Sequence, residues 1–151
     1  MQEWVEQELE TAGLGDERLD ARFRVLTDCL SRRPSASIPT ACGGPAEMTA
    51  AYRFFGNQRV DAPGVLMPHR QATFGRIRAE RVVLLIQDTT ESDVTRPEQQ
   101  VEGAGPLSDE SHWGFYDHAS LAVTPERVPL GVVDANLWAR DEDEFRENQR
   151  L

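Results

Sequence analysis

Asp88 is the residue of this sequence whose position best suits metal-dependent chemistry. It follows the apolar run Val82–Ile86 directly, in the segment Ile86-Gln87-Asp88-Thr89-Thr90. A carboxylate at the end of a buried strand is held in place and can bind a divalent cation such as Mg²⁺ next to a substrate. A turn or capping aspartate produces the same pattern, and that simpler interpretation stays open. Phosphodiester chemistry needs several converging carboxylates, and no spacing identifies a second ligand.

The same segment permits a different reaction, with Asp88 as a nucleophile. Enzymes that form an aspartyl-phosphate attack with such a carboxylate. They usually carry another Asp two residues later and a helix after a short loop. This chain has Thr90 at that position, followed by a long polar segment. An aspartyl-phosphate phosphotransferase is therefore the less favoured enzymatic interpretation.

The charge of the chain is unevenly distributed. All 16 basic residues are arginine, and the net charge is −10. Residues 1–81 hold 11 acids and 11 arginines, whereas residues 82–151 hold 15 acids and 5 arginines. A protein that coats nucleic acid without specificity is basic overall. Any contact with DNA must therefore come from individually placed arginines.

Some arginines are spaced in a way that suits phosphate and groove contacts. Arg18 and Arg22 lie one helical turn apart, and Arg53 directly follows a tyrosine. A solvated helix face with local ion pairs, such as one from Arg24 to Asp28, explains the same spacing more simply. From spacing alone, the solvated face is the favoured interpretation.

The first 80 residues have the apolar period and the punctuation of short helices, which predicts a small all-α domain over 1–80. We expect helices over residues 3–12, 17–33, 45–55 and 61–80, the last broken at Pro68, with a loop over 34–44. Asp16 is the expected N-cap of the second helix, and Pro45 the first residue of the third. The expected apolar stripes are Leu19, Phe23, Leu26 and Leu30 in the second helix, and Met48, Ala51, Tyr52 and Phe55 in the third.

The second half of the chain, residues 81–151, has strand patterns, so the fold class is α+β. The pattern of residues 82–86 predicts a strand buried on both faces. Residues 89–112 are predicted to form a long polar loop. A hairpin over 115–138 turns at Thr124–Arg127. Strands without a covering helix cannot bury both faces of the central one, and the tail after Asp141 is charged. The chain therefore looks cut off.

The cysteine spacing, the hydropathy and the N-terminal residues argue against a cysteine metal site, a membrane-spanning helix and a secretory signal. Cys29 and Cys42 lack metal-site spacing and are expected to be reduced thiols. No apolar run is long enough to span a bilayer, and the N-terminus does not resemble a secretory signal. We expect no membrane partner and a cytoplasmic location. We expect the histidines to be solvated or to form local hydrogen bonds (His69, His112 and His118). We expect the large aromatic residues of the second half to pack in the core or the hairpin (Trp113, Phe115 and Trp138).

An ordered set of segments resembles a known family. The segments run from Leu14-Gly15-Asp16-Glu17-Arg18 and Ala21-Arg22-Phe23, through Ala51-Tyr52-Arg53-Phe54-Phe55, Ile86-Gln87-Asp88-Thr89-Thr90, Gly114-Phe115 and His118, to Val128-Pro129-Leu130-Gly131 and Leu137-Trp138-Ala139-Arg140. Together they resemble the N-terminal third of bacterial cut-and-paste DDE transposases of the insertion-sequence-four family, the group of the Tn-five transposase. The resemblance covers nearly the whole chain.

The resemblance implies a helical domain that recognises the double-stranded DNA of a transposon's terminal inverted repeat. It implies that a ribonuclease-H-like catalytic domain begins after residue 80. Asp88 would be the first Asp of the catalytic triad and a Mg²⁺ ligand. The protein would be nucleoid-associated when bound to DNA. The residues implied in contacts with end-sequence DNA are Arg18, Arg22 and Arg53, followed by Tyr52 and, last, Arg32.

Two departures from the family pattern limit what these residues are expected to do. Trp113 stands where the family usually has Arg. The second Asp of the triad, in an Asp-Arg-Glu segment, and the Glu, in a Tyr-Arg-x-x-Lys/Glu segment, are both missing from this sequence. We therefore expect a truncated transposase that binds DNA and is catalytically incomplete alone. A non-enzymatic remnant, or an inhibitor of a full-length transposase, is the alternative. The protein partners expected on DNA are a full-length transposase or a second copy of this chain.

Overall fold

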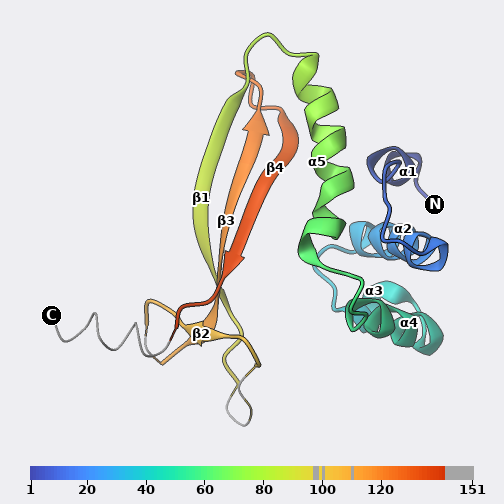
Figure 1. The fold of residues 1–151 in the computed structure, drawn as a ribbon, viewed down its shortest axis with the longest axis vertical. Coiled ribbons are helices and arrows are strands. Elements are labelled where there is room, and N and C mark those ends of the chain that lie inside the picture. The colour runs from blue at the N-terminus through green and yellow to red at the C-terminus, as the bar shows by residue number, and fades with distance from the viewer. Residues whose placement is uncertain (97–98, 100, 110, 142–151) are drawn as a thin grey trace, which may run out of the picture. The chain divides into compact units, whose positions relative to one another are not determined.

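The computed structural model describes residues 1–96, 99, 101–109 and 111–141. Its contacts divide the chain into two units, Met1–Ala79 and Glu80–Leu151. The first is helical and the second holds an antiparallel sheet, so the fold is α+β (Figure 1). Within the described residues, no helix is both long and apolar enough to cross a membrane. The helices of the first unit are α1 (Glu3–Glu8), α2 (Glu17–Arg32), α3 (Ile38–Cys42), α4 (Pro45–Phe55) and α5 (Ala62–Arg78).

Several helices begin or end at residues whose type favours a helix end. The Asp16 side chain accepts a hydrogen bond from the Arg18 backbone N–H and caps α2, as expected of an N-cap aspartate. Pro45 is the first residue of α4, and Gly56 follows its end. Asp61 caps α5 by accepting from the Gly64 N–H. The predictions for Asp16 and Pro45 are confirmed, since each depends only on neighbouring residues.

Three helix predictions are wrong. The first helix ends at Glu8, four residues before the expected end. The expected loop over 34–44 contains α3, which Gly43 ends with a left-handed φ of 78°, the conformation that glycine favours. Helix α5 continues through Pro68 without a break. The Pro68 side chain is fully buried, so its packing offsets the hydrogen bond that a proline cannot donate.

The core of the helical unit also corrects one predicted stripe. On α4 the buried residues are Ala51 and Phe54, whereas Tyr52 and Phe55 are 53% and 50% exposed. The ring of Phe54 stacks on Phe23 of α2, with centroids 5.9 Å apart and an interplanar angle of 16°. Of the predicted stripe, Ala51 is confirmed as buried, whereas Phe54 is buried in place of Phe55 and Tyr52 is exposed. The core cluster is Val5, Leu9, Leu14, Phe23, Leu26, Cys42, Ala51 and Phe54.

The second unit is a sheet with a long central strand. Strand β3 (Trp113–Val123) pairs antiparallel with β1 (Leu84–Asp93), with β4 (Pro129–Trp138) and with the short β2 (Gly105–Pro106). The hairpin predicted over 115–138 is confirmed as β3 and β4. Its register includes two irregularities, between Ser120 and Leu121 and between Ala122 and Val123.

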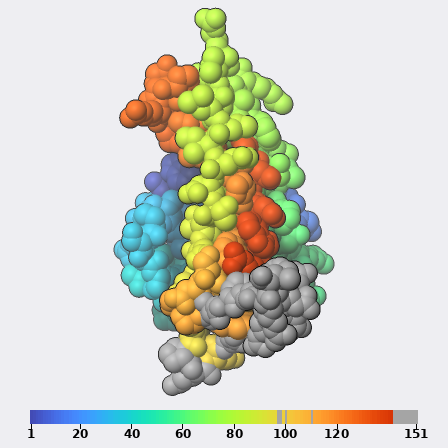
Figure 2. All heavy atoms as spheres, turned by 90° about the vertical axis from the view of Figure 1, so that its left-hand side faces the viewer, coloured from blue at the N-terminus to red at the C-terminus, as the bar shows by residue number. Residues whose placement is uncertain are grey.

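Strand β1 differs most from its prediction. The expected strand over 82–86 was to be buried on both faces, but Leu84, Leu85 and Ile86 are 49%, 61% and 51% exposed. Among the described strands, only β3 pairs with β1, which makes β1 an edge strand; Figure 2 shows it as a yellow-green strip on the surface. It also continues to Asp93, into the predicted polar loop. The charged tail from residue 142 lies outside the described residues.

The burial of Phe54 instead of Phe55 predicts unequal effects for these two adjacent phenylalanines. Phe54→Ala removes a buried ring and leaves a cavity, so it should lower the free energy of unfolding by about 3–5 kcal/mol. Phe55→Ala removes a half-exposed ring and should cost about 1 kcal/mol or less. Urea denaturation followed by far-ultraviolet circular dichroism measures both. Equal losses, or a larger loss for Phe55→Ala, would contradict the structure of α4.

Candidate nucleic-acid interface

Many arginines of the helical unit already have partners that stabilise the fold. The Arg24 side chain donates to the Leu9 carbonyl at 3.1 Å, and Arg33 donates to the Thr40 carbonyl at 2.9 Å. Further arginines pair with carboxylates: Arg32 with Asp28, Arg59 with Asp16 and Arg76 with Glu8. The pair expected between Arg24 and Asp28 does not form among the described residues, because Asp28 takes Arg32 instead. These guanidinium groups hold helices and loops together.

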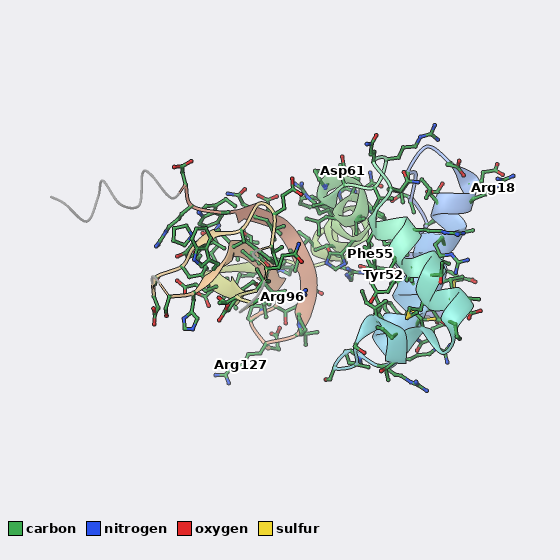
Figure 3. All side chains as sticks on the ribbon, turned by 90° about the horizontal axis from the view of Figure 1, so that it is seen from below. Arg18, Tyr52, Phe55, Asp61, Arg96 and Arg127 are labelled. Carbon is green, nitrogen blue, oxygen red and sulfur yellow. The ribbon has the colours of Figure 1, made fainter. Side chains whose placement is uncertain are left out.

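The three arginines ranked first from the sequence differ from these. Within the described residues, the side chains of Arg18, Arg22 and Arg53 make no hydrogen bond or ion pair. Arg18 and Arg53 are exposed and Arg22 is half-buried; Figure 3 shows Arg18 pointing away from the helices. Their donors are therefore available to an anion. Arg78 is also unpaired, but it ends α5, where a cation interacts favourably with the helix dipole.

The aromatic stack of the core fixes two of these arginines on their helices. Arg22 directly precedes Phe23, and Arg53 directly precedes Phe54. Because the two rings stack on each other, the backbone that carries each arginine is anchored to the other helix. Arg18 lies in the first turn of α2, where the Asp16 cap holds its backbone. Rigid placement of this kind reduces the entropy lost when a side chain binds a phosphate.

Arg32 and Tyr52, the weaker candidates, have different surroundings. The Arg32 guanidinium donates to both carboxylate oxygens of Asp28, at 3.1 and 3.2 Å. This bond, with a second from the Gln2 backbone, lowers the pKa of the Asp28 carboxyl. Arg32 is thus committed to an ion pair on its own helix. Tyr52 is exposed on α4 next to Arg53, so its ring and hydroxyl can be reached from solvent.

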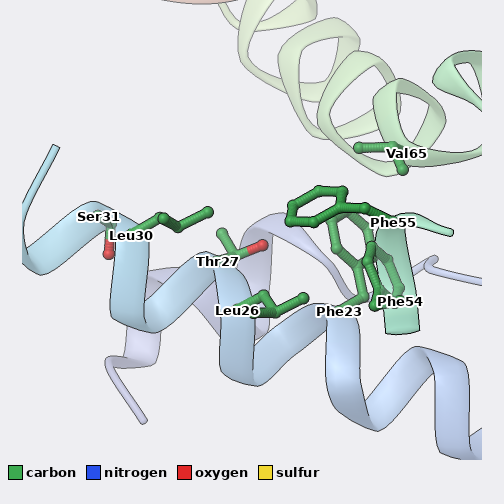
Figure 4. A pocket seen from close by; sticks show the side chains of 8 residues that line it. All are labelled: Phe23, Leu26, Thr27, Leu30, Ser31, Phe54, Phe55 and Val65. Carbon is green, nitrogen blue, oxygen red and sulfur yellow. The ribbon is translucent and has the colours of Figure 1, made fainter. Parts of the chain in front are cut away.

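An apolar groove of about 300 Å³ lies between α2, α4 and α5 (Figure 4). Phe55 and Val65 face each other across it, from α4 and α5. No charged residue or histidine lines it, so it lacks the converging polar groups of a catalytic pocket. The lining residues are Phe23, Leu26, Thr27, Leu30, Ser31, Phe54, Phe55 and Val65.

Both cysteines are free thiols in the helical unit. Cys42 is 5% exposed, and its burial raises the pKa of its thiol. A thiol whose pKa is raised is less often ionised and less reactive. Cys42 is therefore part of the core and not a nucleophile.

A carboxylate on α1 connects this helix to α5. Arg76 donates to both oxygens of Glu8, at 2.7 and 3.0 Å, and also to the Thr73 hydroxyl. His69 Nδ1 lies 2.5 Å from Glu8 Oε1. Burial alone raises the pKa of the Glu8 carboxyl, but the bonds and charges of Arg76 and His69 outweigh it, and the pKa is lowered. The same pairing raises the pKa of Arg76.

Asp88 lies in the middle of β1, not at the end of a strand. It is exposed and is paired in register with Ala119 of β3, five residues before β1 ends at Asp93. One of its oxygens accepts from the Thr89 backbone N–H at 2.9 Å. The prediction that Asp88 follows a strand is therefore wrong, and the aspartyl-phosphate interpretation loses its structural basis.

The register brings a second carboxylate to the same face as Asp88. Asp117 is opposite Thr90, two residues along from Ala119, so it lies diagonally across from Asp88. Its Oδ1 atom is buried and has no hydrogen-bond partner among the described residues. The sequence contains no signal for this proximity, because it depends on how β1 pairs with β3.

These carboxylates do not complete a Mg²⁺ site of the kind that phosphodiester cleavage requires. The described residues contain no group of three or more His, Cys, Asp or Glu side chains that could hold a metal ion. Asp88 and Asp117 supply at most two carboxylates, whereas such sites use more. The donor set present here therefore does not fit the metal expected from the resemblance.

The histidines are locally bonded, as predicted for each. His69 contacts Glu8, His112 lies 3.7 Å from Asp109, and His118 Nδ1 is 2.7 Å from the Thr89 hydroxyl. Trp138 also has a packing role, since its ring stacks on Tyr116 with centroids 5.4 Å apart. The Arg140 guanidinium lies 4.5 Å from the same Tyr116 ring. Tyr116, Trp138 and Arg140 therefore pack together within the second unit.

Comparison with known protein families gives a match within the helical unit. Residues 1–60 match the transposase DNA-binding family. The match covers α1 to α4, which carry Arg18, Arg22 and Arg53, and it supports a transposase N-terminus and DNA as a partner. No curated protein matches the chain.

Because the pKa of Glu8 is lowered in the fold, we expect its contribution to the free energy of unfolding to depend on pH. Glu8→Gln should lower the free energy of unfolding by about 1–3 kcal/mol at neutral pH, since Arg76 loses its charged partner. A lowered pKa stabilises the fold above the ordinary carboxyl pKa of 4.5, and this contribution is lost as the pH falls through the lowered value. The difference between wild type and variant should therefore disappear in acid.

Thermal unfolding from neutral to acidic pH measures this difference. Glu6→Gln is the matched control, because Glu6 lies on the same helix, is exposed and makes no ion pair within the described residues. A difference between wild type and Glu8→Gln that stays constant into acid would show that the pair does not depend on ionised Glu8.

Proposed function

We propose that the helical unit binds the terminal inverted repeat of a transposable element, as the first step of DNA transposition. The observation that carries this proposal is the coincidence of two features within residues 1–60. These residues match a transposase DNA-binding family, and they contain three arginines whose side chains have no hydrogen-bond or ion-pair partner among the described residues. Arg18, Arg22 and Arg53 are then the groups that contact DNA.

The chemistry of guanidinium supports this assignment. Arginine binds phosphate oxygens or the edge of guanine through two parallel hydrogen bonds. Because the chain has a net charge of −10, general electrostatic attraction cannot hold it on DNA. Binding must come from a few rigid contacts. Tyr52 adds a hydroxyl beside Arg53, and Arg32 contributes least because Asp28 occupies it.

For the second unit, we propose that the sheet is the start of a ribonuclease-H-like catalytic domain of the insertion-sequence-four type. The order of a helical unit followed by long antiparallel strands, with Asp88 on β1, is compatible with it. Asp88 is then the first Asp of a DDE triad. The Asp-Arg-Glu segment is not among these 151 residues, so we propose that they bind DNA without cutting it.

A second candidate function is association with another transposase chain. Within the described residues, β1 has one unpaired edge and three exposed apolar side chains at its start. Unpaired strand edges accept a further strand from another molecule. A chain that binds transposon ends and also pairs with a full-length transposase would block productive assembly.

Binding to DNA can be tested after selecting the preferred duplex from a random-sequence pool. Arg22→Ala and Arg53→Ala should each weaken binding by about 1–3 kcal/mol if they contact bases, or lower the salt slope by about 1 if they contact phosphate. Fluorescence anisotropy across a salt series separates these outcomes. Unchanged binding in both variants would reject the assignment.

Two controls belong to this experiment. Arg32→Ala removes an arginine that is paired with Asp28, and it should change binding by less than about 1 kcal/mol. Asp88→Asn should leave binding intact or strengthen it slightly, because it removes a negative charge. Loss of binding in Asp88→Asn would show that this carboxyl has a different role.

Inhibition can be tested by co-expression with an active member of the insertion-sequence-four family. Excision should fall as the amount of this chain rises. If binding alone causes the effect, Arg22→Ala and Arg53→Ala should abolish it; if pairing contributes, a change of Leu85 to Asp on β1 should relieve it while DNA binding persists. Unaltered excision at every dose would exclude this second function.

A further inference from the structure

Arg127 adopts a backbone conformation that is unfavourable for an arginine. Its φ is 68°, and it is the one described non-glycine residue with positive φ. This left-handed region brings the Cβ atom close to the backbone, which glycine avoids. A strained residue persists where the surrounding structure enforces it, and such residues cluster at functional sites.

The turn between β3 and β4 enforces this conformation. The Thr124 carbonyl accepts from the Arg127 N–H, and the Thr124 N–H donates to the Val128 carbonyl, each at 2.9 Å. The Thr124 hydroxyl accepts from the Val128 N–H at 3.3 Å. Three-residue hairpin loops of this kind place their last residue in the left-handed region, where glycine is preferred. The chain has an arginine at that position.

The side chain of Arg127 is presented to solvent at the tip of the hairpin. It is exposed, and Figure 3 shows it extending away from the strands. It makes no hydrogen bond or ion pair within the described part of the chain. Thr124, which holds the turn, is 5% exposed. The guanidinium is therefore free, while the backbone beneath it is rigid.

A second exposed arginine lies at the same end of the sheet. Leu84 of β1 is opposite Val123 of β3, which is opposite Pro129 of β4. Arg81, three residues before Leu84, and Arg127, two before Pro129, therefore both leave the sheet at this end. Each has an acidic neighbour, Glu80 or Glu126, so the end is not a broad basic patch.

We propose that Arg127 is a DNA-backbone contact of the second unit, with Arg81 as a lesser contact at the same end. This inference depends on the proposed DNA-binding function and extends it beyond the helical unit. The described residues from 80 to 141 contain ten acids and four arginines. DNA is repelled by most of this unit, so an approach to it requires a cation that projects from the surface. An exposed arginine on a rigid turn meets that requirement.

The experiment separates the charge of Arg127 from its backbone strain. Arg127→Gly removes the guanidinium and relieves the positive φ. Its affinity for the labelled duplex selected from the random-sequence pool should fall about 5- to 10-fold at 0.1 M salt, and its salt slope should fall by about 1. Its melting temperature should not fall, and relief of the strain should raise it by about 2 °C. Loss of binding without loss of stability is the expected result.

Three further variants test whether the charge of Arg127 or its backbone conformation is responsible for the change in binding. Arg127→Asn tolerates the left-handed conformation and should lose binding like Arg127→Gly, whereas Arg127→Lys should retain the salt slope. Glu126→Gln removes the neighbouring negative charge and should strengthen binding slightly.

The possible results also distinguish this inference from the proposed function. If wild type binds and Arg127→Gly and Arg127→Asn bind equally well with the same slope, the Arg127 contact is overturned, and the helical unit alone carries DNA binding. If wild type itself fails to bind any duplex, the proposed function fails, and this inference with it.

Discussion

The contact between Phe23 and Phe54 is the interaction on which the helical unit depends. It joins α2 to α4 at the centre of the core, and each ring is the neighbour of an arginine in the sequence. Burial of such rings contributes more free energy than any ion pair at the surface. The same apolar contact therefore stabilises the fold and fixes where Arg22 and Arg53 can reach. A change in this packing would displace both arginines without altering either side chain.

Arginine serves two purposes in this unit, and the structure separates them. Arg24, Arg33 and Arg76 donate to carbonyls or carboxylates of other segments and so hold the chain together. Arg18 and Arg53 make no such bond within the described residues. In a chain with no lysine, residue type alone cannot tell these roles apart. Their partners in the fold can, and this is why the ion pair of Arg32 with Asp28 lowers the rank of Arg32.

Sequence reasoning succeeded where the signal is local. The cap at Asp16, the start at Pro45 and the turn at residues 124–127 each depend on a few adjacent residues. It failed where tertiary structure decides. The burial of Phe54 instead of Phe55 depends on where α2 lies, and Pro68 stays in α5 because its ring is packed.

The site residues follow the same division. Spacing and the resemblance were enough to select Arg18, Arg22 and Arg53 as candidates. The sequence could not predict that their side chains lack partners among the described residues. For Asp88, the apolar run before it predicted a strand buried on both faces. That prediction failed because a run of residues that favour strands does not reveal how many neighbouring strands will pair with it. Its diagonal neighbour Asp117 and the strain at Arg127 are set by strand register and turn geometry, which the sequence does not state.

The exposed edge of β1 has a consequence for how this protein behaves at high concentration. Alternate N–H and C=O groups of an edge strand point outward and can join any other strand, which makes such edges sites of aggregation. The first residues of β1 are apolar and favour this. Asp88 in its middle and Glu91 and Asp93 near its end oppose it, since parallel stacking of identical strands would place like charges side by side. Uncharged side chains at these positions would remove that protection and favour fibril growth from β1.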